Sequence, residues 1–366
     1  MSGIARHMFP GDNTPGGFFS YYQYILSQQE AEKIYCLKGG PGVGKSTFIR
    51  KIGEEMLAEG HDVDFMHCSS DSNSLDGIVL RDKKIALVDA TSPHVVDPIN
   101  PGAVDTIVHL GEYWDEAGIR RNRDAIVGKN AELKTIFARA YNYFGAAGKM
   151  YDNLTAIYEM GLKKEEMYKL AANIINQELT HKELSAEIGK MKKYFGSGIT
   201  PAGFVHFLET LVQGYKKIYL IKAPVGVSGT KILSLFAESA LYRGFDVEAY
   251  YCPLKPEEKI EHLLVPELGV AFLTHNRFHI VDESKLTGEV VPVDLSRLVD
   301  SGRIDKQRHI AEDSYMKMEE LFKKGIDCLK EAKAEHDHLE ENYIPNMDFA
   351  KIENLRKEIA AAIRRA

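Results

Sequence analysis

Apolar residues are grouped in two ways in this chain, as short uninterrupted runs and as longer stretches in which they recur at helical spacing. In the first third, short runs predict strands at 34–38 and 85–89, a strand that ends at Cys68, and a fourth strand at 105–110. A helix that stops at Gly60 is predicted after the first run, from apolar positions at Phe48, Ile49, Ile52, Met56 and Leu57. Strands that alternate with helices indicate an α/β fold with a parallel sheet covered on both faces.

The same order of patterns occurs a second time. Residues 9–22 (FPGDNTPGGFFSYY) align with residues 195–208 (FGSGITPAGFVHFL), and residues 60–68 (GHDVDFMHC) align with residues 244–252 (GFDVEAYYC). The offset of 184 to 186 residues is much longer than the unit of a solenoid repeat. We therefore expect two whole α/β domains in tandem.

A long helical pattern without strand signals follows each α/β part. In the first half an apolar stripe runs from Leu133 to Ile157 and is interrupted at Gly161, and in the second half the interruption falls at 344–345. Each pattern predicts a helical hairpin, whose stripes are explained by packing between helices or, alternatively, by a partner-binding arm. The expected domains are an α/β domain at 1–127, a hairpin at 128–190, a second α/β domain at 191–311 and a second hairpin at 312–366.

Composition narrows the class of protein. The 366 residues carry a net charge of −7, so no overall basic field points to nucleic acid or to an anionic membrane. No apolar run reaches the roughly 20 residues of a membrane helix, and the first residues do not resemble a secretory signal. Four cysteines without a CxxC pair predict neither a disulfide framework nor a zinc site, and we expect a cytoplasmic location.

Residues 39–46, GGPGVGKS, fit the phosphate-binding (P-loop) pattern G-x-x-x-x-G-K-[ST], with a predicted strand before it and a helix after it. The glycines permit a tight loop whose amides converge on phosphates, and the helix adds its positive end. Lys45 is expected to reach the β- and γ-phosphates, Ser46 to bind Mg²⁺, and Thr47 to touch the α-phosphate. The predicted nucleotide-binding residues are Gly39, Gly40, Pro41, Gly42, Val43, Gly44, Lys45, Ser46 and Thr47.

A P-loop also needs a carboxylate near Mg²⁺ at the end of a neighbouring strand, and Asp89 ends the apolar run 85–89. We expect Asp89 and Ser46 to hold Mg²⁺, and Lys45 and Asp89 to act in catalysis; a polar strand-end cap is the alternative for Asp89. The next residue is Ala90, so the acidic residue that many ATPases use there to activate water is absent. This favours slow hydrolysis, transfer to another acceptor, or a nucleotide-operated switch.

The second copy of the loop, KAPVGVSGTK at 222–231, lacks these groups. At an offset of 184, Lys45 corresponds to Gly229, and Lys231 lies two positions later, which turns its amine by about 200° around a helix. Asp89 corresponds to Thr274. We therefore expect the second half to be a degenerate P-loop-like domain that has lost its nucleotide site.

Other polar residues are candidates for the functional site, but each also has a simpler structural explanation. Asp71 follows the second strand, where α/β sheets bind ligands, but it is also an ordinary loop aspartate. Arg120, Arg121 and Arg123 could stabilise charge on a phosphoryl group or form a solvated helix start. The segment 335–342, EHDHLEEN, could bind adventitious metal but fits a solvated helix face. The residues that match between the halves, His94 with His279 and Cys68 with Cys252, are expected to be structural.

The segments GGPGVGKST, VDATSPH and the paired TPGGF and TPAGF resemble a little-characterised family of bacterial cytoplasmic proteins that consist of two P-loop ATPase-like halves. The resemblance covers nearly the whole chain, and the loop motif is its specific part. It implies two tandem P-loop NTPase-like domains and ATP binding through residues 39–47, and it gives no substrate.

The leading hypothesis is a protein that binds Mg²⁺ with ATP, or with GTP, and hydrolyses it slowly at the first loop. One alternative is a kinase that transfers the γ-phosphoryl group to a small-molecule acceptor. Another is a switch that binds a protein partner in a nucleotide-dependent way without significant turnover. No sequence feature indicates nucleic acid or membrane as a partner.

Overall fold

The computed structural model describes residues 2–91 and 96–366. The strands of its first sheet are β1 (Ala5–Met8), β4 (Lys33–Lys38), β5 (Val63–His67), β6 (Leu75–Leu80), β7 (Ile85–Asp89) and β8 (Asp105–His109). Their order in the sheet is β1-β5-β6-β7-β4-β8. The pairs that include β6 are antiparallel, and the others are parallel. The first half is therefore a mixed, mostly parallel sheet.

A second six-stranded sheet has the same arrangement. Its strands are β9 (Met191–Phe195), β12 (Lys217–Lys222), β13 (Val247–Cys252), β14 (Lys255–Val265), β15 (Val270–His275) and β16 (Glu289–Asp294). From β9 the order is β9-β13-β14-β15-β12-β16, which matches the first sheet strand for strand, and β14 is the antiparallel member. The fold class is confirmed in its coarser form, α/β with two mostly parallel sheets.

The side chains of each strand alternate between two cores. In β7, Ile85 and Leu87 face the core that contains the helix after the glycine loop, whereas Ala86 and Val88 face a core shared with the second sheet. Leu220 and Leu273 enter this shared core from the second sheet. The expectation that helices cover both faces is therefore corrected, because the inner face of each sheet packs toward the other sheet.

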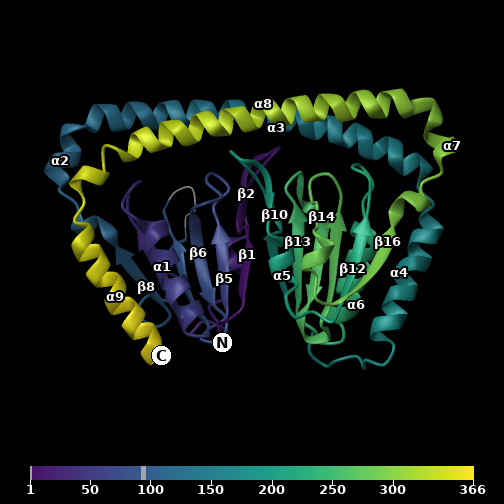
Figure 1. The fold of residues 1–366 in the computed structure, drawn as a ribbon, viewed down its shortest axis with the longest axis horizontal. Coiled ribbons are helices and arrows are strands. Elements are labelled where there is room, and N and C mark those ends of the chain that lie inside the picture. Colours follow the sequence, from purple (N-terminus) through teal and green to yellow (C-terminus); the bar gives the residue numbers. More distant parts are fainter. Residues whose placement is uncertain (1, 92–95) are drawn as a thin grey trace.

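The two sheets meet at their edges in the centre of the molecule (Figure 1). Phe9, just after β1, and Phe195, the last residue of β9, exchange two backbone hydrogen bonds of 3.0 and 2.9 Å. Two small hairpins follow these strands, β2 (Gly11–Thr14) with β3 (Gly17–Ser20), and β10 (Ser197–Thr200) with β11 (Gly203–His206). The Phe9–Phe195 bridge joins the ends of the two central edge strands and so links the first sheet to the second.

Two long helices span both sheets. These are α3 (Arg123–Gly161) and α8 (Arg308–Glu340), which run side by side in opposite directions above the sheets (Figure 1). Phe144 of α3 and Phe322 of α8 pack with ring centroids 6.1 Å apart in the core between the helices. The remaining helices are α1 (Lys45–Ala58), α2 (Glu116–Arg121), α4 (Lys164–Leu179), α5 (Leu208–Leu211), α6 (Thr230–Leu241), α7 (Ser301–Ile304) and α9 (Phe349–Arg365).

The last helix of each half packs on the α/β part of the other half. Helix α4 belongs to the first half by sequence but packs on α6 of the second, and α9 belongs to the second half but packs on α1 of the first (Figure 1). Ile359 and Ile363 of α9 are buried in one cluster with Ile52 and Met56 of α1. The helices form and break where we expected, but they do not fold into hairpins. With 39 residues, α3 is about 58 Å long and reaches the far half before the chain can turn.

Two strands of each six-stranded sheet were not predicted from the sequence, β1 and β6 in the first and β9 and β14 in the second, and neither were the two small hairpins. In β6 the apolar residues Ile78, Val79 and Leu80 follow Asp76 and Gly77, so the run is short and its start is polar. Within the described residues, no helix combines the length and the apolar character that crossing a bilayer requires.

Candidate functional site

The first glycine loop connects β4 to α1 at the carboxyl end of the first sheet. Gly42 and Gly44 have φ angles of +68° and +86°, which glycine adopts without strain. Gly44 precedes α1 and no side chain caps that helix, so its first amides remain available to an anion. The loop thus has the backbone form that phosphate binding requires.

Packing beneath the loop supports its shape. Val43 is fully buried beneath the loop, and a Cβ at Gly39 would lie 2.8 Å from Val43 Cγ2. Pro41 is half-buried, and Thr47 is exposed on the first turn of α1. Val43 is therefore a packing residue that requires glycine at position 39.

Lys45 bends back over the loop. Its Nζ donates to the carbonyl oxygens of Gly39 at 3.1 Å and Gly40 at 2.8 Å, and it lies 3.7 Å from Asp89 Oδ2. The parallel pairing of β4 with β7 brings these groups together, because Leu37 and Asp89 are opposite each other. The structure thus unites the lysine and the carboxylate that the sequence predicted.

The hydroxyl of Ser46 and the carboxylate of Asp89 are the predicted Mg²⁺ ligands. Ser46 Oγ accepts a hydrogen bond of 2.9 Å from the amide of Leu75 in β6, and Asp89 Oδ1 accepts one of 2.9 Å from the amide of Thr91. Both side chains are fixed by these backbone contacts on adjacent strands and keep free lone pairs. Hard oxygen donors of this kind fit Mg²⁺ together with phosphate oxygens.

The second half covers this loop, as expected for a partner that completes or regulates the site, but the residues that do so were not predicted from the sequence. A Cβ at Gly40 would lie 2.9 Å from Tyr343 Cε1, and a Cβ at Gly42 would lie 3.0 Å from Glu340 Cβ and 3.1 Å from Ile344 Cγ1. These residues come from the end of α8 and the segment after it. The apolar stripe of α8 indicated a buried face but carried no signal for which loop it would cover.

Asp71 lies in the turn between β5 and β6. It accepts hydrogen bonds from the amide of Asn73 at 3.0 Å and the hydroxyl of Ser74 at 3.1 Å, and its Oδ2 lies 3.5 Å from Lys333 Nζ in α8. These contacts stabilise the turn and link it to the second half.

The candidate arginines are on the surface. Arg120, Arg121 and Arg123 are exposed, Arg121 lies 3.9 Å from Asp115, and Arg123 pairs with its neighbour Asp124 at 2.9 Å. The structure does not bring them to Lys45 within the described residues, so the explanation as a solvated helix start is favoured.

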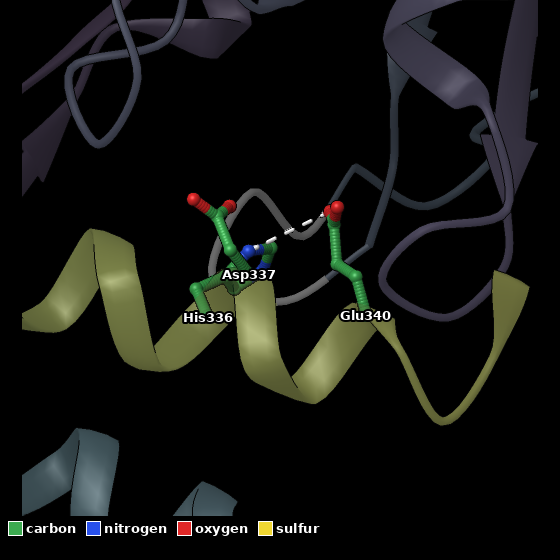
Figure 2. A group of neighbouring side chains, drawn as sticks. All are labelled: His336, Asp337 and Glu340. Atoms are coloured by element: carbon green, nitrogen blue, oxygen red, sulfur yellow. Dashed lines mark ion pairs between the residues drawn. The ribbon is translucent and has the colours of Figure 1, made fainter.

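His336, Asp337 and Glu340 in α8 form a cluster on the helix that covers the loop (Figure 2). Their ligand atoms lie within 4.8 Å of one another, and His336 Nδ1 is 3.6 Å from Glu340 Oε1. Asp337 also pairs with Lys333 at 2.5 Å. The prediction of a solvated helix face is correct in part, because His336 and Glu340 are half-buried rather than free in solvent.

The second glycine loop lacks the charged groups of the first. Lys231 directs its Nζ to the ring of Tyr168 in α4, 5.7 Å from the ring centroid. Its position fits the prediction that this amine turns away from the loop. Thr274, the residue before the end of β15, stands at the place of Asp89 and donates its hydroxyl proton to the carbonyl of Glu261. Beside this loop, a cavity of ≈ 340 Å³ is lined by residues of α3, α4 and α6.

A buried polar cluster lies near Thr274. Burial would raise the pKa of Glu261, but the charge and hydrogen bond of Lys259, whose Nζ is 2.8 Å away, together with the neighbouring His279 and His262 lower it to about 2. His279 Nε2 lies 3.6 Å from Glu261, and burial lowers the pKa of His279 to about 4. His279 is thus enclosed beside a charged pair, as a structural histidine would be. Its counterpart His94 lies outside the described residues.

The paired cysteines are buried as well. Burial raises the pKa of Cys68 well above its ordinary value and raises that of Cys252 to about 12. These thiols are therefore poor nucleophiles, which agrees with the structural role expected for them.

Comparisons with known proteins do not assign the chain to a family. No protein-family model matches the chain, and neither the curated proteins nor the solved structures gave a match.

Proposed function

We propose that this protein binds a nucleoside triphosphate with Mg²⁺, ATP in the first instance, at residues 39–47 and hydrolyses it slowly. The observation that carries the proposal is the position of Lys45 Nζ, which is 2.8 Å from the Gly40 carbonyl and 3.7 Å from Asp89. It is supported by the glycine loop and the uncapped start of α1.

In this proposal each residue has a distinct task. When nucleotide binds, the amine of Lys45 gives up its hydrogen bonds to the loop carbonyls and donates to phosphate oxygens instead. The amides of the loop and of α1 donate to the remaining phosphate oxygens. Ser46 and Asp89 would hold Mg²⁺, which when bound neutralises charge on the phosphates. Asp89 also holds the lysine in place by its charge.

Slow turnover follows from the surroundings of Asp89. Ala90 offers no group to activate water, and Tyr343 and Glu340 cover the loop from outside. Neither Ala90 nor Thr91, the described residues directly after Asp89, is a base for water, and the residues that lie against Gly40 and Gly42 come from the second half.

A second candidate is a nucleotide-operated switch, and the contact of α8 with the loop favours it. Glu340 and Tyr343 lie against loop glycines, and α8 continues across the molecule to the second sheet. A change in the loop on nucleotide binding would therefore act on a helix that joins both halves.

Phosphate release from MgATP at steady state tests the proposal, with Lys45→Ala as the inactive variant. Lys231→Ala is the matched control, because Lys231 is the lysine of the second loop. The proposal expects slow release by the wild type and the control and none by Lys45→Ala. Tight MgATP binding without phosphate release would contradict hydrolysis and support the nucleotide-operated switch. Absence of MgATP binding would contradict both functions.

A further inference from the structure

A cavity of ≈ 220 Å³ lies between α1 and α9, beside the first glycine loop. Gly44 and Thr47 form the wall nearest the loop, and Phe349, the first residue of α9, stands opposite them. The Phe349 ring is 3.5 Å from the place of a Cβ on Gly44, and the residue is 43% exposed. An aromatic ring thus lies partly uncovered next to the end of the loop.

The cavity borders the proposed phosphate site, because Gly44 and Thr47 line it. Thr47 is the residue assigned to the α-phosphate, and in a nucleotide the ribose and base follow directly from that phosphate. A chain of phosphates that begins at Lys45 and Asp89 and leaves past Thr47 therefore leads to this cavity. Its volume is below the ≈ 300 Å³ of typical ligand pockets, so it suits one base better than a whole nucleotide.

We propose that this cavity binds the nucleobase, with Phe349 of the second half stacked on its face; the inference rests on the proposed nucleotide binding at residues 39–47. Aromatic side chains bind bases in this way because every base has a π-face. The second half thus contributes a binding residue to the first-half site, and the exchange of α9 between halves becomes part of nucleotide binding.

The far wall of the cavity is polar and fixed. Glu353 pairs with Lys51 at 3.0 Å and with Arg356 at 2.8 Å, and Arg356, only 5% exposed, also pairs with Glu55 at 2.7 Å. Glu353 lines the cavity, and in this proposal its carboxylate also accepts from an exocyclic amino group, which adenine, guanine and cytosine carry. Stacking on Phe349 favours the larger purines among them.

The second half provides a matched control. Lys164, the first residue of α4, corresponds to Phe349 at an offset of 185 residues and lines the cavity of the second half. Substitution of Lys164 changes the equivalent point of the fold without touching the first loop.

Calorimetric titration with MgATP and with magnesium tripolyphosphate, which has no base, tests the proposal. Phe349→Ala should weaken MgATP binding about tenfold or more, by loss of stacking, and leave tripolyphosphate binding unchanged. Phe349→Trp should keep MgATP affinity, and Lys164→Ala should change neither ligand.

Two results would overturn the inference: wild-type MgATP affinity in Phe349→Ala, or an equal loss of both ligands. Neither result would affect the proposed function, which fails instead if wild-type protein binds neither ligand or if Lys45→Ala binds both normally.

Discussion

The Nζ of Lys333 in α8 lies 3.5 Å from Oδ2 of Asp71, in the turn between β5 and β6 beside the first glycine loop. Both side chains are about one-third exposed, so this ion pair adds little stability by itself. The ion pair connects the second half of the chain to the first-half site. Two further contacts do the same: Glu340, at the end of α8, lies against Gly42, and Tyr343, just after α8, lies against Gly40.

Gly42→Ala should destabilise the protein by about 1–2 kcal/mol, because alanine is strained at a φ of +68° and its Cβ would lie 3.0 Å from Glu340 Cβ. Gly214→Ala is the control, since Gly214 has a similar φ of +80° and nothing within 4 Å of its Cβ position. Denaturant unfolding measures both. A loss in Gly42→Ala no larger than in Gly214→Ala would show that α8 does not press on the loop.

Ile363→Ala should lower the free energy of unfolding by about 2–5 kcal/mol, as expected for a buried isoleucine, although residue 363 lies at the end of the second half. The loss should appear in the first half, because Ile363 packs in the core of α1. Hydrogen exchange should therefore speed up in α1 and β4 before β12 and β15. Faster exchange confined to the second sheet would contradict the exchange of helices.

The positions of the glycine loop and of Asp89 in the fold could be predicted from the sequence, because both depend on local signals. The loop is a contiguous motif, and Asp89 ends an apolar strand that pairs in parallel with β4, so one register brings it to Lys45. The order of the strands in the two halves also follows the internal repeat. These parts of the fold needed no knowledge of distant contacts.

The covering of the loop could not be predicted in the same way. The apolar stripes of α8 and α9 indicate that one face of each helix is buried, but they do not indicate that Ile359 is buried in the core of the first half. Phe349 is partly exposed, and its importance depends on its distance from Gly44, which lies more than 300 residues earlier. Partner choice between similar halves is decided by helix length and packing, which a pattern of apolar positions does not encode.

Asp89→Asn should remove the dependence of nucleotide binding on Mg²⁺. The amide oxygen can still accept the hydrogen bond from Thr91, so the strand end should stay folded, but the charge that attracts the metal is lost. Titrations with ATP in Mg²⁺ and in EDTA measure the ratio of affinities. Asp97→Asn is the control, since Asp97 pairs with Lys38 at the surface, and an unchanged ratio in Asp89→Asn would contradict the metal assignment.

The protein should lose stability as the pH falls from about 6.5 to 4, and His67 should account for part of this loss. Burial lowers the pKa of His67 to about 4, although its bond to the Ser72 carbonyl acts in the opposite direction. Its Nδ1 donates to that carbonyl, so in the neutral pair Nε2 accepts a hydrogen bond from Nδ1–H of His7.

Because the unfolded chain binds the proton more tightly in this range, the stabilisation is complete above pH 6.5 and is lost as the pH falls toward 4. The loss from His67 is on the order of 3 kcal/mol. His67→Asn should flatten the pH dependence measured by denaturant unfolding, and the exposed His181→Asn should not. Parallel pH profiles for wild type and His67→Asn would contradict the assignment.

The most direct test of one nucleotide site, formed by the first loop, is the stoichiometry of MgATP binding to the wild type, Lys45→Ala and Lys231→Ala in calorimetric titration. We expect one ATP per chain for the wild type and for Lys231→Ala, and no measurable binding for Lys45→Ala. Two ATP molecules per chain, or loss of binding in Lys231→Ala with Lys45→Ala unaffected, would contradict the account.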